Sequence, residues 1–185
     1  VVESPFERLD IESNSNTYKL SFSQPIMQTP WQTLTLGLSA IKRDSQTSIL
    51  GENYPLSEGA DENGETKLSI LQLFQDYELR GKNQVLAFNS QLNVGLGILG
   101  ATKNSSEPDS RFLYWRGQGQ WVRELAKNTL LVVGADLQLS PFDLVPKEQF
   151  GLGGYRSVRA YRQDTRLTDN GALGTVELRL PLPWI

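Results

Sequence analysis

Residues 84–100 read QVLAFNSQLNVGLGILG, and the strict alternation in this stretch decides the fold class. On one side lie Leu86, Phe88, Leu92, Val94, Leu96 and Ile98, and these alternate with Asn89, Gln91, Asn93, Gly95 and Gly97. Successive side chains of a β-strand point to opposite faces, and the stretch therefore predicts a strand with one apolar and one polar face. Such a strand is longer than the usual soluble strand of about five or six residues.

The same alternation recurs along the whole chain. It is clear in residues 17–26, 33–40, 129–140 and 172–180, and weaker in 65–78 and 111–123. We expect about seven strands and no convincing amphipathic helix, so the chain is predicted to be all-β.

Short and long connections between these segments alternate strictly. Short turns fall near residues 28–31, 80–83 and 126–128, whereas long polar loops fall at 50–64, 102–110 and 141–170. This layout predicts an antiparallel meander with tight turns at one end and large loops at the other, which is typical of an outer-membrane barrel.

The position of the apolar face relative to lipid is a separate question. Trp31 and Trp121 adjoin tight turns, where an aromatic belt would meet a membrane interface. A soluble sandwich or barrel remains an alternative, because alternation alone does not say whether a face points to lipid or to a core. The length of the segments and the Gly, Asn, Gln and Thr on their polar faces favour the membrane barrel.

Composition excludes several classes of function. The chain has 18 basic and 21 acidic residues, a net charge of −3, no cysteine and no histidine. It therefore has no disulfides, no thiolate metal site and no Ser-His-Asp catalysis, and it lacks the clustered basic charge of a nucleic-acid surface. We expect no catalytic residue, no metal and no cofactor. The sequence contains no run of about 18 apolar residues, so it predicts no transmembrane helix.

The sequence FGLGGYRSVRAYRQD, residues 150–164, is the segment that says most about function. Glycines 151, 153 and 154 allow tight backbone turns, and arginines 156, 159 and 162 follow them. Arginines in such a setting usually have a defined partner, which predicts a structured loop. The spacing G-x-G-G, with no helix after it, does not fit the G-x-G-x-x-G of a dinucleotide site.

Together with LTDNG (167–171) and GALGTVELRLPL (171–182), this segment resembles the TpsB outer-membrane transporters of two-partner secretion. These are the haemolysin secretion/activation proteins of the ShlB/FhaC/HecB type, in the superfamily that includes the BamA barrel-assembly proteins. The stretches SFSQPIMQTPWQTLTLGLS (21–39) and PDSRFLYWRGQGQWVREL (108–125) are similar to strand units of the same family. The most specific part of the resemblance is 146–182.

The resemblance implies a larger protein. Family members have periplasmic POTRA domains followed by a C-terminal transmembrane β-barrel of roughly sixteen strands. Residues 1–185 would then be part of that barrel, about its sixth to twelfth strands, with the POTRA domains and the final strands outside this chain.

The resemblance also implies a functional loop that folds back into the barrel lumen. The family carries a V-R-G-Y or V-R-G-F tetrad at the tip of that loop, and residues Val158, Arg159, Ala160 and Tyr161 occupy it here, after Gly153 and Gly154. Ala160 departs from the family pattern, which has glycine.

In the family, the tetrad arginine is anchored to an acidic residue on the inner barrel wall. That partner generally lies on a strand after the one that begins near Gly171, and Glu177 is the candidate within this chain. The alternation places Asp136, Glu177 and Arg179 on polar faces, so we expect them to face the lumen.

The function that the resemblance implies is translocation across the bacterial outer membrane. A monomeric barrel, embedded in the bilayer, would secrete and help to activate a large TpsA-type haemolysin or adhesin, without a cofactor and without binding nucleic acid. The alternatives are a BamA-like factor that inserts other outer-membrane proteins, a general diffusion porin, and a soluble ligand-binding barrel.

Overall fold

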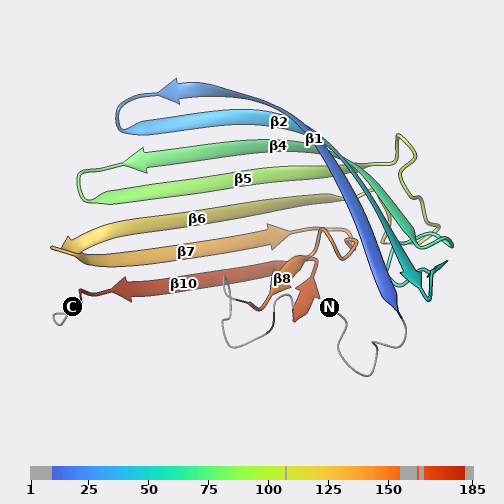
Figure 1. The fold of residues 1–185 in the computed structure, drawn as a ribbon. Coiled ribbons are helices and arrows are strands. Elements are labelled where there is room, and N and C mark those ends of the chain that lie inside the picture. Colours follow the sequence, from blue (N-terminus) through green and yellow to red (C-terminus); the bar gives the residue numbers. More distant parts are fainter. Residues whose placement is uncertain (1–9, 107, 155–161, 163–164, 182–185) are drawn as a thin grey trace.

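The computed structural model describes residues 10–106, 108–154, 162 and 165–181. They form one curved antiparallel sheet with a small hairpin beside it (Figure 1). The main strands are β1 (Ile11–Gln28), β2 (Gln32–Ile49), β4 (Glu65–Arg80), β5 (Gln84–Leu96), β6 (Leu113–Ala126), β7 (Thr129–Leu139) and β10 (Gly171–Arg179). Within the described residues no helix is long and apolar enough to span a membrane.

The strand order confirms the predicted meander. The sheet runs β1-β2-β4-β5-β6-β7-β10, and each of these strands pairs antiparallel with its neighbours. The short strand β3 (Glu52–Asn53) pairs with the end of β2, whereas β8 (Phe150–Leu152) and β9 (Arg166–Thr168) pair with each other. Figure 1 shows the short turns at one end of the sheet and the long connections at the other.

Three strand boundaries differ from the sequence-based expectation. β1 and β2 each have 18 residues, because their ladder continues from Ile11↔Ile49 through positions that are polar on both faces and so carry no alternation. β5 ends at Leu96 rather than at Gly100, since Leu99 and Gly100 have positive φ angles of 55° and 75° and form a turn.

The two faces of the sheet differ in chemistry. One, the apolar face, carries large hydrophobic side chains that are exposed on most strands, including Leu20, Phe22, Leu38, Leu73, Leu92 and Val176. The other, the polar face, carries Ser39, Gln72, Asn93 and Gln138, all of them buried. The observed registers place Ser39 opposite Gln72 and Gln72 opposite Asn93, so these side chains share one face.

A compact hydrophobic core lies on the polar face, at the end of the sheet with the long connections. It joins Leu68 and Ile70 of β4 to Phe112 and Tyr114, and the connection after β7 closes it with Leu144 and Val145. The long connection between β7 and β10 therefore does not extend into solvent at this point. Its first part, residues 140–152, folds back onto the polar face, and we call it the return segment.

Candidate functional site

The return segment is tied to the sheet at its base by the LTDNG sequence. The amide side chain of Asn170 bonds the backbone of Ser140 twice, accepting from its N–H at 2.8 Å and donating to its carbonyl at 3.0 Å. The carboxylate of Asp169 accepts hydrogen bonds from the Leu144 N–H at 2.8 Å and from the Gln149 side chain at 3.0 Å. Residues on both sides of the connection therefore hold each other in place.

Glu148 is the polar centre of the return segment. Its carboxylate is buried, forms an ion pair with Arg43 of β2, and accepts a hydrogen bond from the Tyr114 hydroxyl of β6 at 2.7 Å. The side chain of Gln138, on β7, donates to the Glu148 carbonyl at 2.9 Å. Glu148 thus connects β2 to β6 and β7, across the strands β4 and β5 that separate them in the sheet.

Burial is the largest influence on the pKa values of Glu148 and Lys147. Burial raises the pKa of the Glu148 carboxyl above its usual range, although Arg43 and Tyr114 act in the opposite direction. Burial and the nearby Arg43 likewise lower the pKa of Lys147, whose ammonium group donates to Ser15 of β1 at 2.9 Å. Because contacts reach from β7 to β1, the return segment bridges the width of the curved sheet.

Phe150 fixes the far end of the return segment against β10. Its ring is 1% exposed and covers Gly171, where an added Cβ would lie 2.3 Å from the ring. The Arg116 guanidinium lies 5.3 Å from the centre of the same ring, a cation–π contact. Only a glycine at position 171 leaves room for this ring.

Asp136 lies on the polar face, as expected from the alternation. It holds Arg116 through two hydrogen bonds, of 3.1 and 2.8 Å, and accepts a third from Gln118 at 2.7 Å. A bidentate pair of this kind orients the guanidinium rigidly. Asp136 thereby positions Arg116 under Phe150, a role that the sequence did not indicate.

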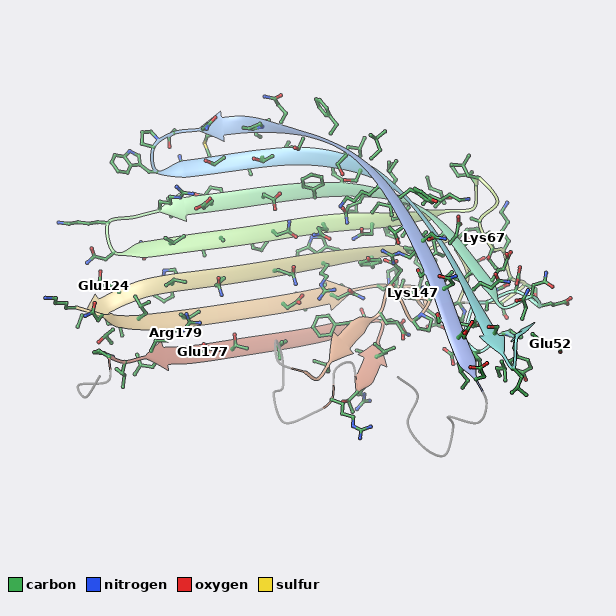
Figure 2. The ribbon with its side chains drawn as sticks, viewed as in Figure 1. Glu52, Lys67, Glu124, Lys147, Glu177 and Arg179 are labelled. Atoms are coloured by element: carbon green, nitrogen blue, oxygen red, sulfur yellow. The ribbon has the colours of Figure 1, made fainter. Side chains whose placement is uncertain are left out.

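Glu177 and Arg179 also lie on the polar face, as their register with Val132 and Leu130 of β7 shows. The Arg179 guanidinium donates to the Glu177 carboxylate at 3.2 Å. In Figure 2 both residues lie towards the short-turn end of β10, whereas Lys147 of the return segment lies at the opposite end of the sheet. Asp136 is the register partner of Leu173, four residues before Glu177, so the three predicted polar-face residues do not form one cluster.

The two glycines of the loop motif have the backbone conformation that requires glycine. Gly153 and Gly154 have φ angles of 116° and 94°, and a Cβ at Gly153 would lie 2.2 Å from the Arg162 carbonyl oxygen. The tetrad itself, Val158, Arg159, Ala160 and Tyr161, lies outside the described residues. The pairing of Arg159 with Glu177 therefore stays a prediction.

A hollow of about 870 Å³ lies between the return segment and the polar face. Its walls include Asn89, Gln118 and Asp136 from the sheet and the glycines 151, 153 and 154. Polar side chains of this face bond one another, for example the Gln72 amide to Asn93 at 2.8 Å and the Asn89 amide to the Asp76 carboxylate at 2.6 Å. Such a surface offers many hydrogen-bond donors and acceptors to a polar chain.

Several residues that shape this site were not among the sequence-based candidates: Arg43, Tyr114, Gln138, Glu148 and Phe150. Glu148, Phe150 and Tyr114 lie in segments that resemble the family, but nothing in the sequence indicated what their side chains contact. These residues come into contact only because the return segment packs over β2, β6 and β7, and this tertiary packing cannot be read from the local sequence.

Comparison with known proteins finds a matching family model and two solved structures of similar fold. The family model of the haemolysin secretion/activation protein ShlB/FhaC/HecB matches residues 1–185. The fold is similar to CdiB from Escherichia coli, with a TM-score of 0.79 and 20% identity over 95% of this chain and 33% of that one. It is also similar to CdiB from Acinetobacter baumannii, with a TM-score of 0.73 and 21% identity over 94% of this chain and 30% of that one.

Two further facts describe the extent of these similarities. No curated protein matches the chain significantly. The chain spans about a third of the length of the solved structures that it matches.

Proposed function

Because the chain belongs to the haemolysin secretion/activation protein family ShlB/FhaC/HecB, we propose that it is part of an outer-membrane transporter of two-partner secretion. In this proposal residues 1–185 form about strands six to twelve of the C-terminal β-barrel. POTRA domains and further strands belong to the same protein, and a TpsA-type haemolysin or adhesin is the cargo.

The observation that carries the proposal is the return segment on the polar face. A sheet that exposes leucine and phenylalanine on its other face suits a lipid environment. In a closed barrel the polar face would line the interior. A connection that folds back over that face and is held by Glu148, Asn170 and Phe150 would stand in the path of a transported chain.

The mechanism that follows needs no covalent chemistry. An unfolded partner would thread in an extended form past the amide side chains of the polar face, which can exchange hydrogen bonds with a peptide backbone. The tetrad beyond Gly154, anchored through Arg159, would hold the loop in one of few stable arrangements until the cargo shifts the balance. The partner would fold only after it leaves the barrel.

The test is replacement of Arg159 by alanine in the full-length transporter. We expect secretion of the cognate partner to fall, while the amount of folded barrel in the outer membrane is largely unchanged. Arg166→Ala is the matched control, because Arg166 is an exposed arginine of β9 in the same connection, outside the tetrad. Normal secretion by the Arg159 variant would refute the anchoring role.

Two other outcomes would change the assignment. Loss of assembly of unrelated outer-membrane proteins in a deletion strain, with secretion unaffected, would indicate a BamA-like insertion factor. Open conductance of the purified protein, without effect on any secreted protein, would indicate a diffusion porin.

A further inference from the structure

The two ends of the sheet differ in charge. The stretch 42–67, at the end with the long connections, has three basic and six acidic residues. The short-turn end has five cations (Arg80, Lys82, Arg123, Lys127, Arg179) and three carboxylates (Glu78, Glu124, Glu177). Figure 2 shows Glu52 and Lys67 at one end and Glu124, Glu177 and Arg179 at the other.

The cations of the short-turn end fall into two groups. Arg80 and Arg179 form ion pairs with Glu78 and Glu177. Lys82, Arg123 and Lys127 form no ion pair within the part of the chain that the structure describes, and all three are exposed. The excess positive charge of this end is therefore carried by these three residues.

One of the three unpaired cations, Arg123, contacts a tryptophan, and the other two lie in the turns at the same end of the sheet. Arg123 shares the apolar face with Trp121, and its guanidinium lies 5.9 Å from the centre of the indole ring. The indole N–H donates to Gln84, which is the register partner of Arg123. Lys82 and Lys127 lie in the turns that join β4 to β5 and β6 to β7, on either side of the paired strands β5 and β6.

The acidic residue next to Arg123 in the sequence, Glu124, belongs to the other face of the sheet. Glu124 follows Arg123 in β6, so its side chain starts on the opposite, polar face. Its backbone N–H bonds the Asn83 carbonyl at 2.8 Å, which keeps the two turns side by side.

We propose that Lys82, Arg123 and Lys127, together with Trp121, form a binding surface for anionic phospholipid headgroups at the short-turn end of the sheet. This proposal rests on the proposed insertion of the sheet in a bilayer. The phosphodiester and the acidic headgroup of the lipid meet the three cations, and the indole ring lies at the depth of the headgroups. Below them, Leu86 and Phe88 of the apolar face contact the acyl chains.

Charge complementarity selects an anionic lipid over a zwitterionic one. Cations close to a membrane surface attract acidic lipids individually, and their effects combine when they lie within one headgroup area. The cation–π contact holds the Arg123 guanidinium beside the indole.

The test measures lipid selectivity of the full-length protein in phosphatidylcholine vesicles. Electron spin resonance of spin-labelled lipids gives the relative association of phosphatidylglycerol and phosphatidylcholine with the protein surface. We expect phosphatidylglycerol to be favoured by about two- to fourfold in the wild type. In the triple variant Lys82→Gln, Arg123→Gln, Lys127→Gln the preference should fall to about one.

The matched control removes the same charge from the opposite end. The variant Lys42→Gln, Lys67→Gln, Lys103→Gln should retain the wild-type preference, because Lys42 and Lys67 already pair with Asp44 and Glu65. Equal binding of both lipids by the wild type, or equal loss in both variants, would overturn the proposed surface. If the protein slows the motion of neither spin-labelled lipid, this result would instead refute the membrane insertion on which the proposed function rests.

Discussion

The two faces of the sheet use hydrophobic side chains in opposite ways. On the apolar face Leu20, Phe22 and Val176 are 78%, 72% and 74% exposed. On the polar face, beneath the return segment, Leu144 and Phe150 are 0% and 1% exposed. Among the described residues none covers these side chains of the more hydrophobic face, while the compact core lies on the face that is otherwise polar.

This contrast indicates where each face obtains its stability. Apolar side chains are stabilised by leaving water, so the apolar face depends on a lipid neighbour. The core under the return segment is stabilised by intramolecular contacts and should persist in any medium that keeps the sheet folded. Mutations on the two faces should accordingly respond differently to lipid.

The largest expected effect comes from a charge in the middle of the apolar face. Leu73→Arg in β4 should lower the free energy of unfolding of the full-length protein in lipid vesicles by about 2–4 kcal/mol, because the guanidinium must enter the hydrocarbon layer. Equilibrium denaturation in vesicles measures this value.

The matched change on the polar face is Gln118→Arg. It adds the same charge beside Asp136, where it remains hydrated, and should cost less than about 1 kcal/mol. Equal costs at both positions would mean that the apolar face is not in contact with lipid.

A smaller effect should follow from an added methyl group at the contact between Gly171 and the Phe150 ring. Gly171→Ala places a methyl group against the Phe150 ring and should weaken docking of the return segment by about 1–3 kcal/mol. Hydrogen exchange of residues 140–152 measures the docking. Gly174→Ala is the control on the same strand, because no atom lies within 4 Å of the added methyl, and faster exchange in both variants would contradict this account.

The smallest effect concerns pH. The pKa of Glu148 is raised in the folded protein, so the folded state holds this proton more tightly than the unfolded chain, whose glutamate pKa is about 4.3. Docking of the return segment should therefore be most stable at low pH and weaken as the pH rises through the raised pKa.

Hydrogen exchange at about pH 5 and about pH 7.5, corrected for intrinsic rates, checks the sign of this dependence. Protection of residues 140–152 should be greater at the lower pH, and Glu148→Gln should abolish the difference. Greater protection at the higher pH would show that the ion pair with Arg43 outweighs burial.

The period-two pattern was sufficient to predict the meander because it depends only on the alternation of faces. Each of the strands β1, β2, β4, β5, β6, β7 and β10 corresponds to an alternating segment, and the short turns fall where they were expected. The pattern failed in residues 42–48 of β2, because every position there is polar and the sequence does not distinguish the two faces.

The interior of the site could be predicted only in part. The observed register places Asp136, Glu177 and Arg179 on the polar face, whereas their contact with a lumen stays a prediction. Alternation could not find Glu148, whose partners Arg43 and Tyr114 are 105 and 34 residues away in sequence. The hairpin of β8 and β9 was also missed, because strands of three residues are too short to show a period.

The central claim, that the polar face lines the path of a transported protein and the apolar face meets lipid, has a direct test at two adjacent positions of β5. A photo-crosslinking amino acid is placed at Gln91, on the polar face, or at Leu92, on the apolar face, in the full-length transporter during secretion of its partner. The account predicts crosslinks to the partner from position 91 and none from position 92. Crosslinks to the partner from position 92, or from neither position while secretion proceeds, would contradict it.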